Sequence, residues 1–396
     1  MLWIQNADLE ELQLDIVGFL AILGEGSVLA NVQVLTLSRW IFLPRLIPAP
    51  QALMRPTRPT VLEPVPGHVT GVFSGNFRDS ITHIGNIICD ASNLPEFSVR
   101  VVSIRRTGPN RLKSKTVAPL TLVLFIGFSL SILLLVLSIV LDDGMSLVAT
   151  LLLSFLSTLI GWGNKWTLVL PERKEKRGKV PRGDVVIRYP KGSFLVVRCE
   201  EEVARELYWA PETVKYLMTH GPAYRVMSLV GTVMLMGGVI CLANAQIKSQ
   251  IAWAGSYMLL GSSYWIVAAL PSKLHWDTSS YTVENECLTD SDMELKGYPC
   301  ANKTFTQALW HAIVVAKSTD WVIRSNACPD TRTWKDWLAM ATEMSKAVKE
   351  APTPRSKGVK TWQVPDWDPQ AYLAELFDQG SRNDEKRDQG FGIQEV

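Results

Sequence analysis

The sequence has little of what catalysis and metal binding usually require. Its five histidines are isolated from one another, and none of its six cysteines forms a C-x-x-C pair, so neither a zinc site nor a thioredoxin-like site is indicated. It also lacks G-x-S-x-G, G-x-x-x-x-G-K-[ST] and H-E-x-x-H motifs. The net charge of +2 gives no reason to expect nucleic acid as a partner. We therefore expect no cofactor and no metal.

Charged residues make up only 20% of the chain, and they are absent from four long apolar runs. The runs span residues 117–141, 145–163, 226–246 and 251–270. Each is long enough to cross about 30 Å of hydrocarbon as a helix. Very short turns join the first two runs and the last two, so each pair is expected to be antiparallel. The predicted fold class is an α-helical membrane protein with four transmembrane helices in two hairpins, 117–163 and 226–270; the alternative is a pair of core hairpins in a soluble protein.

The four runs contain no Asp, Glu, Lys, Arg or His, which argues against an ion pathway or proton relay within them. They do contain small residues, which let helices approach closely in lipid. We expect five glycines to pack the helices of the second hairpin: Gly231, Gly237, Gly238, Gly255 and Gly261.

Basic residues gather at the outer ends of the first hairpin, whereas the tight turns hold a single lysine. The cluster before it contains Arg105, Arg106, Arg111, Lys113 and Lys115, and the cluster after it contains Lys165, Arg173, Lys174, Lys176, Arg177, Lys179 and Arg182. The positive-inside rule then places both termini and the middle loop in the cytosol, at the plasma membrane or an endomembrane. The same residues are suited to anionic lipid headgroups, besides the bilayer itself; the alternative is that they only set the topology.

The segments that flank the first hairpin contain strand-forming residues. Residues 96–106, in the cytosolic segment 67–116, read as a strand, and 185–189 with 194–197, in segment 164–225, read as a hairpin around Pro190-Lys191-Gly192. Because both segments lie on one side of the membrane, we expect this strand to pair with the hairpin in a small cytosolic α+β unit. A helix from Glu200 to Trp209 is predicted to complete it, followed by a short helix from Pro211 that ends at Gly221-Pro222.

The remaining segments are predicted to be helical or irregular. In the cytosolic helical region 271–380 one apolar face contains Phe305, Ala308, Leu309, Ala312, Ile313 and Ala316, and a second stripe contains Trp334, Trp337, Leu338, Ala341, Met344 and Val348. Thr333 is predicted as the N-cap of the second stripe, and Asp368-Pro369 as the start of a last helix through Phe377. Residues 381–396 are expected to be a disordered tail. Residues 1–43 are expected to form a helical stretch at the membrane periphery, which a linker with seven prolines, 44–66, separates from the rest.

Several stretches together resemble a group of uncharacterised multi-pass membrane proteins of filamentous fungi. They are RRTGPNRL, VVIRYPKGSFLVVRCEEEVARELYWAPE, SYWIVAALPSKLHWD and FTQALWHAIVVAKSTDWV, and the resemblance covers roughly residues 67–350. It implies a multi-pass topology and assigns no activity or functional residue.

The function expected by elimination is that of a non-enzymatic interaction or regulatory protein in the membrane, whose protein partner the sequence does not identify. One alternative is a transporter or channel subunit, which would need polar side chains facing a cavity, for which the candidates are Asn164, Asn244, Gln246, Ser262 and Ser263. The other is an enzyme at the membrane surface, which would need His275, Asp277, His311 or the triplet Glu200, Glu201 and Glu202 to converge.

Overall fold

The chain folds into two compact units, each built from three separate segments of sequence. The computed structural model describes residues 25–55, 57–89, 94–108, 111–169, 181–286, 300–352, 360–363, 365 and 367–391. The bundle unit comprises Met1–Val61, Arg111–Val169 and Thr213–Thr278, and the sheet unit comprises Leu62–Asn110, Leu170–Glu212 and Ser279–Val396.

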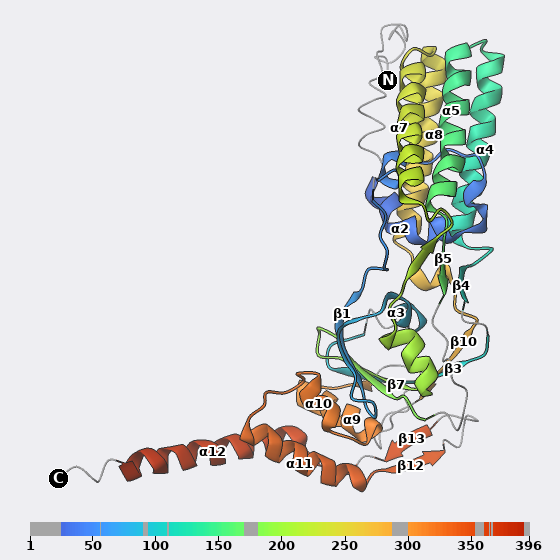
Figure 1. The fold of residues 1–396 in the computed structure, drawn as a ribbon. Helices are drawn as coiled ribbons and strands as arrows, with labels where there is room; N and C mark the ends of the chain where they lie inside the picture. The colour runs from blue at the N-terminus through green and yellow to red at the C-terminus, as the bar shows by residue number, and fades with distance from the viewer. Residues whose placement is uncertain are drawn as a thin grey trace, which may run out of the picture. The chain divides into compact units, whose positions relative to one another are not determined.

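The bundle unit is dominated by long helices (Figure 1): α4 (Pro119–Val140), α5 (Gly144–Asn164), α7 (Gly221–Ala243) and α8 (Ile247–Ala268). Among the described residues, α4, α5 and α7 are long and apolar enough to cross a membrane. The apolar helices therefore indicate a membrane-embedded protein, as the sequence predicts. Helix α8 has a similar length but mixes serines and aromatic residues into its apolar sequence, and a fourth crossing stays a prediction.

The two helical hairpins pack side by side. Helix α7 lies against α5, α5 against α4, and α4 against α8. Buried serine hydroxyls join α4 to α5, Ser131 to Ser154 and Ser138 to Ser146, the latter pair at 2.8 Å. In an apolar bundle such pairs satisfy polar groups that lipid cannot. The first hairpin is thus held together by hydrogen bonds as well as by packing.

A small antiparallel sheet joins the other ends of these helices. Its strands β4 (Arg111–Ser114), β5 (Trp166–Val169), β8 (Val214–Tyr216) and β9 (Trp276–Asp277) follow the order β8-β5-β4-β9. Strand β4 precedes α4, β5 follows α5, β8 precedes α7, and β9 follows α8 after the turn η4 (Ser272–Leu274). The order of the strands repeats the order of the helices, so this sheet, which we call the base sheet, ties the four helix ends together.

Strand β8 lies where the sequence predicts a short helix, and that prediction is wrong. Val214 pairs with Leu168 of β5 in an antiparallel register. Gly221 and Pro222 do not end a helix but begin α7, and the His220 side chain accepts a hydrogen bond from the amide of Ala223. Proline is favoured at the first helical positions because its missing N–H would have no partner there.

The N-terminal segment packs around the bundle, and we call residues 25–54 the N-terminal wrap. It contains α2 (Glu25–Leu37), which lies along α8, and two 3₁₀ turns, η1 (Arg39–Phe42) beside α5 and η2 (Pro50–Leu53) beside α5 and α7. Leu46, Ile47 and Leu53 are buried. The first half of segment 44–66 is therefore packed chain and not the linker that its prolines suggest.

The sheet unit is built on one mixed sheet. The strands β1 (Val65–Gly71), β2 (Phe77–Ile81), β3 (Ser98–Arg106), β6 (Val185–Arg188), β7 (Phe194–Arg198) and β10 (Tyr281–Glu286) follow the order β10-β3-β7-β6-β1-β2, and β11 (Cys300–Ala301) pairs with β3. Strand β3 runs parallel to β7 with Val99 opposite Phe194, and β6 and β7 form the hairpin. The predicted pairing of these segments is confirmed. The outer strands β1, β2 and β10 were not predicted.

Helices cover both faces of this sheet (Figure 1). On one face lie α9 (Phe305–Ala316), α10 (Asp320–Arg324) and α11 (Arg332–Lys346), whose side chains form one core with Val101, Phe194 and Val196. On the other face lie α3 (His83–Cys89), α6 (Glu201–Ala204) and the π-helical turn η3 (Arg205–Trp209). A separate pair of strands, β12 (Lys349–Pro352) and β13 (Lys360–Gln363), follows α11.

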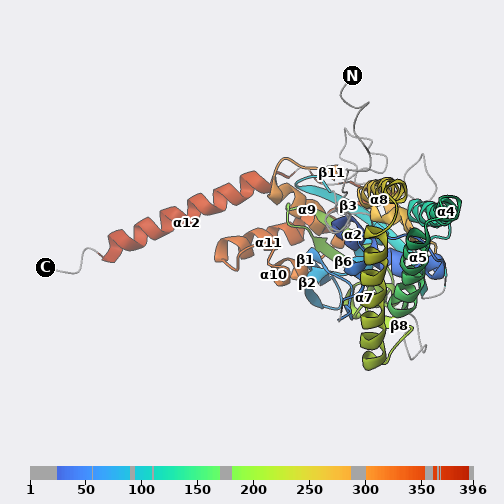
Figure 2. The ribbon, with the colours of Figure 1, turned by 90° about the horizontal axis from the view of Figure 1, so that it is seen from above.

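The helix caps in the C-terminal region agree only partly with prediction. The N-cap of α11 is Thr331 and not Thr333, because the Thr331 hydroxyl accepts a hydrogen bond from the amide of Trp334. The predicted cap of the last helix, α12 (Pro369–Phe391), is confirmed, since the Asp368 carboxylate accepts from the amides of Gln370 and Ala371. Both views show α12 extending beyond the other helices of its unit, and it enters the segment predicted to be disordered (Figures 1 and 2).

Replacing Gly192 with valine is expected to destabilise the sheet unit. Gly192 has φ of 71°, the left-handed conformation predicted for the turn between β6 and β7. A Cβ atom there would lie 3.1 Å from the rings of Phe97 and Phe305. We expect a loss of about 1–2 kcal/mol in the free energy of unfolding, because a β-branched residue fits this conformation poorly. Urea unfolding followed by tryptophan fluorescence measures it, and Lys191→Val, next in the same turn, is the control.

Candidate functional site

The glycines predicted to pack helices divide into two groups. On α7, a Cβ atom at Gly238 would lie 2.7 Å from Leu153 Cγ, one at Gly237 would lie 3.5 Å from Leu152 Cδ1, and one at Gly231 would lie 2.9 Å from Met54 Sδ. These glycines face α5 and the N-terminal wrap. On α8, Gly255 and Gly261 differ from the prediction, because no atom lies within 4 Å of a Cβ built there. The glycines of α7 therefore let the second hairpin approach the first hairpin closely. They do not bring α7 and α8 together.

The predicted basic residues are not gathered in one place. Arg106 donates a 2.8 Å hydrogen bond to the buried carboxylate of Glu206, so its charge is used inside the sheet unit. Arg105 is exposed on the same strand, Lys113 and Lys115 are exposed in the bundle unit, and Arg111 belongs to β4. The cluster of Arg173, Lys174, Lys176 and Arg177 lies outside the described residues.

The residues proposed for a membrane-surface enzyme are divided between the two units. His275 and Asp277 belong to the bundle unit, whereas His311 and the triplet Glu200, Glu201 and Glu202 belong to the sheet unit. Among the described residues no three His, Cys, Asp or Glu side chains are grouped so that they could hold a metal ion. The polar residues suggested for a transport pathway already bond to the chain. Asn244 and Ser263 donate to carbonyls of their own helices, and Gln246 donates to the Leu141 carbonyl at the end of α4.

Arg45 is a buried charge in the bundle that the sequence does not reveal. The N-terminal wrap carries it inward, and its side chain is completely buried. Its Nη1 donates to the carbonyl oxygens of Ile41 and Leu43, each at 3.1 Å. Its backbone amide donates to the Ser157 hydroxyl of α5 at 2.9 Å. Arg45 thus closes the loop after η1 and fixes that loop against a helix long enough to cross the membrane.

The rest of the Arg45 guanidinium lacks a well-placed hydrogen-bond acceptor among the described residues. Its Nε and Nη2 are buried without a partner within the described part of the chain, and the Tyr264 hydroxyl is buried without one as well. Burial lowers the pKa of Arg45, and the neighbouring Tyr264 hydroxyl opposes this through its charge and a loose hydrogen-bonding contact, which leaves the positive charge uncompensated. Removing a charge from water without a counter-charge costs several kcal/mol. Arg45 is therefore a buried charge of the bundle without a counter-charge among the described residues, and Tyr264 lies beside it.

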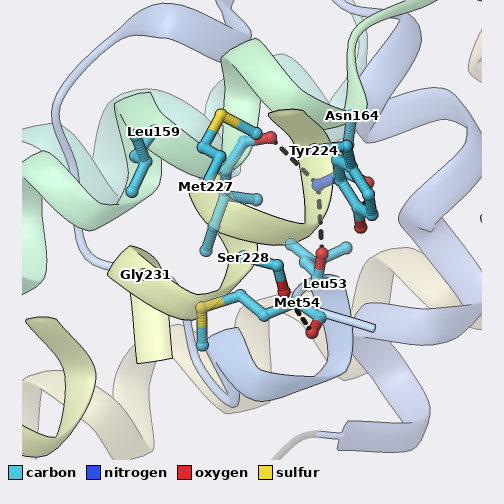
Figure 3. A pocket seen from close by; sticks show the side chains of 9 residues that line it. Leu53, Met54, Leu159, Asn164, Tyr224, Met227, Ser228 and Gly231 are labelled. Carbon is cyan, nitrogen blue, oxygen red and sulfur yellow. Dashed lines mark hydrogen bonds between the residues drawn. The ribbon is translucent and has the colours of Figure 1, made fainter. Parts of the chain in front are cut away.

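A nearby pocket, by contrast, is a packing seam (Figure 3). It is lined by residues of η2, α5 and α7, including Met54, Asn164 and Ser228. The Asn164 amide donates to the Leu53 carbonyl at 3.0 Å, and the Ser228 hydroxyl donates to the Met54 carbonyl at 2.9 Å (Figure 3). The Tyr224 hydroxyl donates to the Arg55 carbonyl at 2.7 Å. Because these polar groups already bond to the chain, the seam attaches the N-terminal wrap to α5 and α7.

Comparison of the chain with known protein families, with curated proteins and with solved structures found no match. The function must therefore be inferred from the geometry described above.

Raising the pH is expected to stabilise the bundle unit through Lys165. Its Nζ donates to the carbonyls of Leu37 and Ser38 at the end of α2, at 2.6 and 2.9 Å. Burial, with a smaller contribution from Arg39, lowers the pKa of Lys165 from 10.5 to about 8. Between these values the unfolded chain binds more protons than the folded chain, so stability rises with pH.

The expected slope is up to about 1.4 kcal/mol per pH unit between roughly pH 8 and 10. Thermal unfolding in detergent at a series of pH values measures it. Lys165→Gln should remove this part of the slope, whereas Lys113→Gln, an exposed lysine of the same unit, should leave it. Equal slopes in both variants would contradict the assignment.

Proposed function

We propose that the protein is a four-span integral membrane protein with both termini in the cytosol, at the plasma membrane or an endomembrane, and that it serves interaction or regulation without catalysing a reaction. The sheet unit is its cytosolic part, and the bundle unit is its membrane part. In this proposal the arrangement of the membrane helices controls the state of the sheet unit, which meets a protein partner. The resemblance to multi-pass proteins of filamentous fungi agrees with such a topology.

The observation that carries this proposal is the base sheet. The chain passes between the units at residues 61/62, 110/111, 169/170, 212/213 and 278/279. Several of these passages are short: β3 ends at Arg106 and β4 begins at Arg111, while β9 ends at Asp277 and β10 begins at Tyr281. A shift of a helix end would displace a base strand and, through a few residues, a strand of the main sheet. A single flexible tether could not transmit such a shift.

The topology is supported by the charges at the two ends of the helices. Lys113, Lys115 and Lys165 lie at the end of the base sheet, whereas the turns at the other end hold Asp142, Asp143 and Lys248. An excess of lysine and arginine marks the cytosolic side. We expect a membrane-impermeant thiol reagent to label Lys191→Cys only after sealed, right-side-out vesicles are opened, and to label Asp142→Cys before. The unsubstituted chain gives the background for both, and the reverse pattern would overturn the orientation.

Coupling between the units is tested by breaking the base sheet in the full-length protein. Thr167 of β5 pairs with Lys215 of β8. Thr167→Pro removes a backbone donor from the strand and Thr167→Val does not. We expect the proline variant, and not the valine variant, to speed hydrogen exchange in β3 and β7 of the sheet unit. If exchange there is the same in both, the base sheet does not transmit changes and the regulatory proposal fails.

A further inference from the structure

We propose that Arg45 and Tyr264 form a binding site for the acidic group of a membrane lipid, a phosphate or a carboxylate. The inference does not depend on the proposed function, because it rests on the bundle unit alone. It concerns residues other than the exposed basic residues that sequence patterns associate with lipid headgroups.

The first argument is the imbalance of donors at Arg45. One guanidinium nitrogen, Nη1, is used by carbonyl oxygens of the wrap, the closest at 3.1 Å. Among the described residues neither Nε nor Nη2 has an acceptor in good hydrogen-bonding geometry, and the neighbouring Tyr264 hydroxyl interacts with the guanidinium but supplies no counter-charge. An oxyanion accepts bonds from two guanidinium nitrogens and a hydroxyl at once, and it also neutralises the charge. A neutral acceptor would satisfy the donors and leave the charge uncompensated.

The second argument is depth. Ser157, which binds the Arg45 amide, lies seven residues before Asn164, the last residue of α5, or about 10 Å along the helix. On α4, the Gly127 carbonyl accepts from the amide of Leu46 and lies eight residues after Pro119, or about 12 Å from the helix start. An acidic group at this depth in a membrane is carried there by an attached apolar chain. A free aqueous phosphate would have to leave water to reach it.

The third argument is space on α8. Gly261 lies one turn before Tyr264, and residues with this spacing are neighbours on one helix face. Gly261 is buried, yet no atom lies within 4 Å of a Cβ placed on it. Its lack of a side chain leaves room for part of a lipid beside the Tyr264 ring. A lipid here would also explain why a glycine occupies this position although it brings no two helices together.

Native mass spectrometry of the full-length protein in detergent tests the inference. The lipid probes are dioleoyl phosphatidic acid, dioleoyl phosphatidylcholine and oleate, which share one acyl chain. Inorganic phosphate is the probe without an acyl chain. We expect one molecule of phosphatidic acid or oleate to be retained, and phosphatidylcholine and inorganic phosphate to bind at least about tenfold more weakly. The stronger of the two acidic lipids tells whether the site prefers phosphate or carboxylate.

Three variants locate the site. Arg45→Gln should lower the affinity for the preferred acidic lipid at least about tenfold, because the ionic hydrogen bonds are lost. Tyr264→Phe removes the hydroxyl donor, so it should weaken lipid binding. It keeps the bonds from Arg45 to the wrap, so the melting temperature of the lipid-free protein should not change. Gly261→Leu fills the space beside Tyr264 and should also reduce binding. Arg39→Gln, which removes an exposed charge of the same wrap, is the matched control.

The outcomes separate a lipid site from a structural arginine. Binding that falls in Arg45→Gln, Tyr264→Phe and Gly261→Leu but not in Arg39→Gln supports the site. Equal retention of acidic lipid by the unsubstituted chain, Tyr264→Phe and Gly261→Leu overturns it, even if Arg45→Gln fails to fold. So does equal affinity for phosphatidylcholine and phosphatidic acid, because recognition would then not depend on the net negative charge of the lipid.

Discussion

Replacing Asp143 with alanine is expected to lower the free energy of unfolding of the bundle by about 2–4 kcal/mol. The buried carboxylate caps two helices at the turn end of the bundle. It accepts a hydrogen bond from the amide of Ser146 in the first turn of α5 at 3.1 Å, and another from the amide of Gln246 at the start of α8 at 2.8 Å. Alanine would leave both amides without this acceptor, and it would release one hairpin turn from the other.

Unfolding of the purified protein by heat or by a denaturing detergent, followed by tryptophan fluorescence, measures this loss. Asp142→Asn is the matched control, because Asp142 is exposed in the same turn and asparagine tolerates its φ of 57°. Asp143→Asn keeps an acceptor oxygen and should lie between the two. If Asp143→Ala is as stable as Asp142→Asn, the carboxylate does not join the hairpins.

The same carboxylate gives the turn an acid sensitivity with a definite sign. Burial raises the pKa of Asp143, but the Ser249 hydroxyl and the amides of Ser146, Gln246 and Met145 lower it by more, so the pKa lies below its ordinary 3.8. A depressed carboxyl pKa contributes stability that is complete above about pH 4 and is lost as the pH falls through the folded value. Asp143→Asn should therefore flatten the acid limb of the stability profile.

The features that the sequence predicted well are those with a local signal. The apolar runs became helices within a few residues of their predicted ends, because length and composition decide that outcome. The β6–β7 hairpin followed from strand-forming residues around a turn that needs Gly192. Its pairing with β3 followed from the short turn of the first membrane hairpin, which brings the two flanking segments together.

The features that were missed depend on contacts between distant residues. Arg45 looks like any surface arginine in a proline-rich stretch, and its burial depends on contacts with α5, including the bond from its amide to Ser157, 112 positions away. Strands β8 and β9 are too short to show a pattern, and their pairing with β5 and β4 decides their conformation. Gly255 and Gly231 look alike in sequence, yet Gly231 contacts the wrap and Gly255 faces open space.

Replacing Gly161 with valine is the second substitution expected to have a large effect. Gly161 is buried on α5 where the wrap crosses it, and a Cβ atom there would lie 2.5 Å from the backbone oxygen of Ile41. That oxygen also accepts the bond from Arg45 Nη1. The backbone of η1 would have to move away, so we expect a loss of about 2–3 kcal/mol in the free energy of unfolding.

Gly255→Val on α8 is the matched control, because it makes the same change within a helix at a position with no atom within 4 Å. It should change the stability by less than about 0.5 kcal/mol. Gly161→Val should in addition speed hydrogen exchange of the amides of Arg45 and Leu46, which bond to Ser157 and Gly127. Equal stability of the two variants, with unchanged exchange at Arg45, would mean that the wrap does not depend on its contact with α5. The burial of Arg45 would then need another cause, since the glycine crossing is what lets η1 approach α5 closely enough to carry this charge inward.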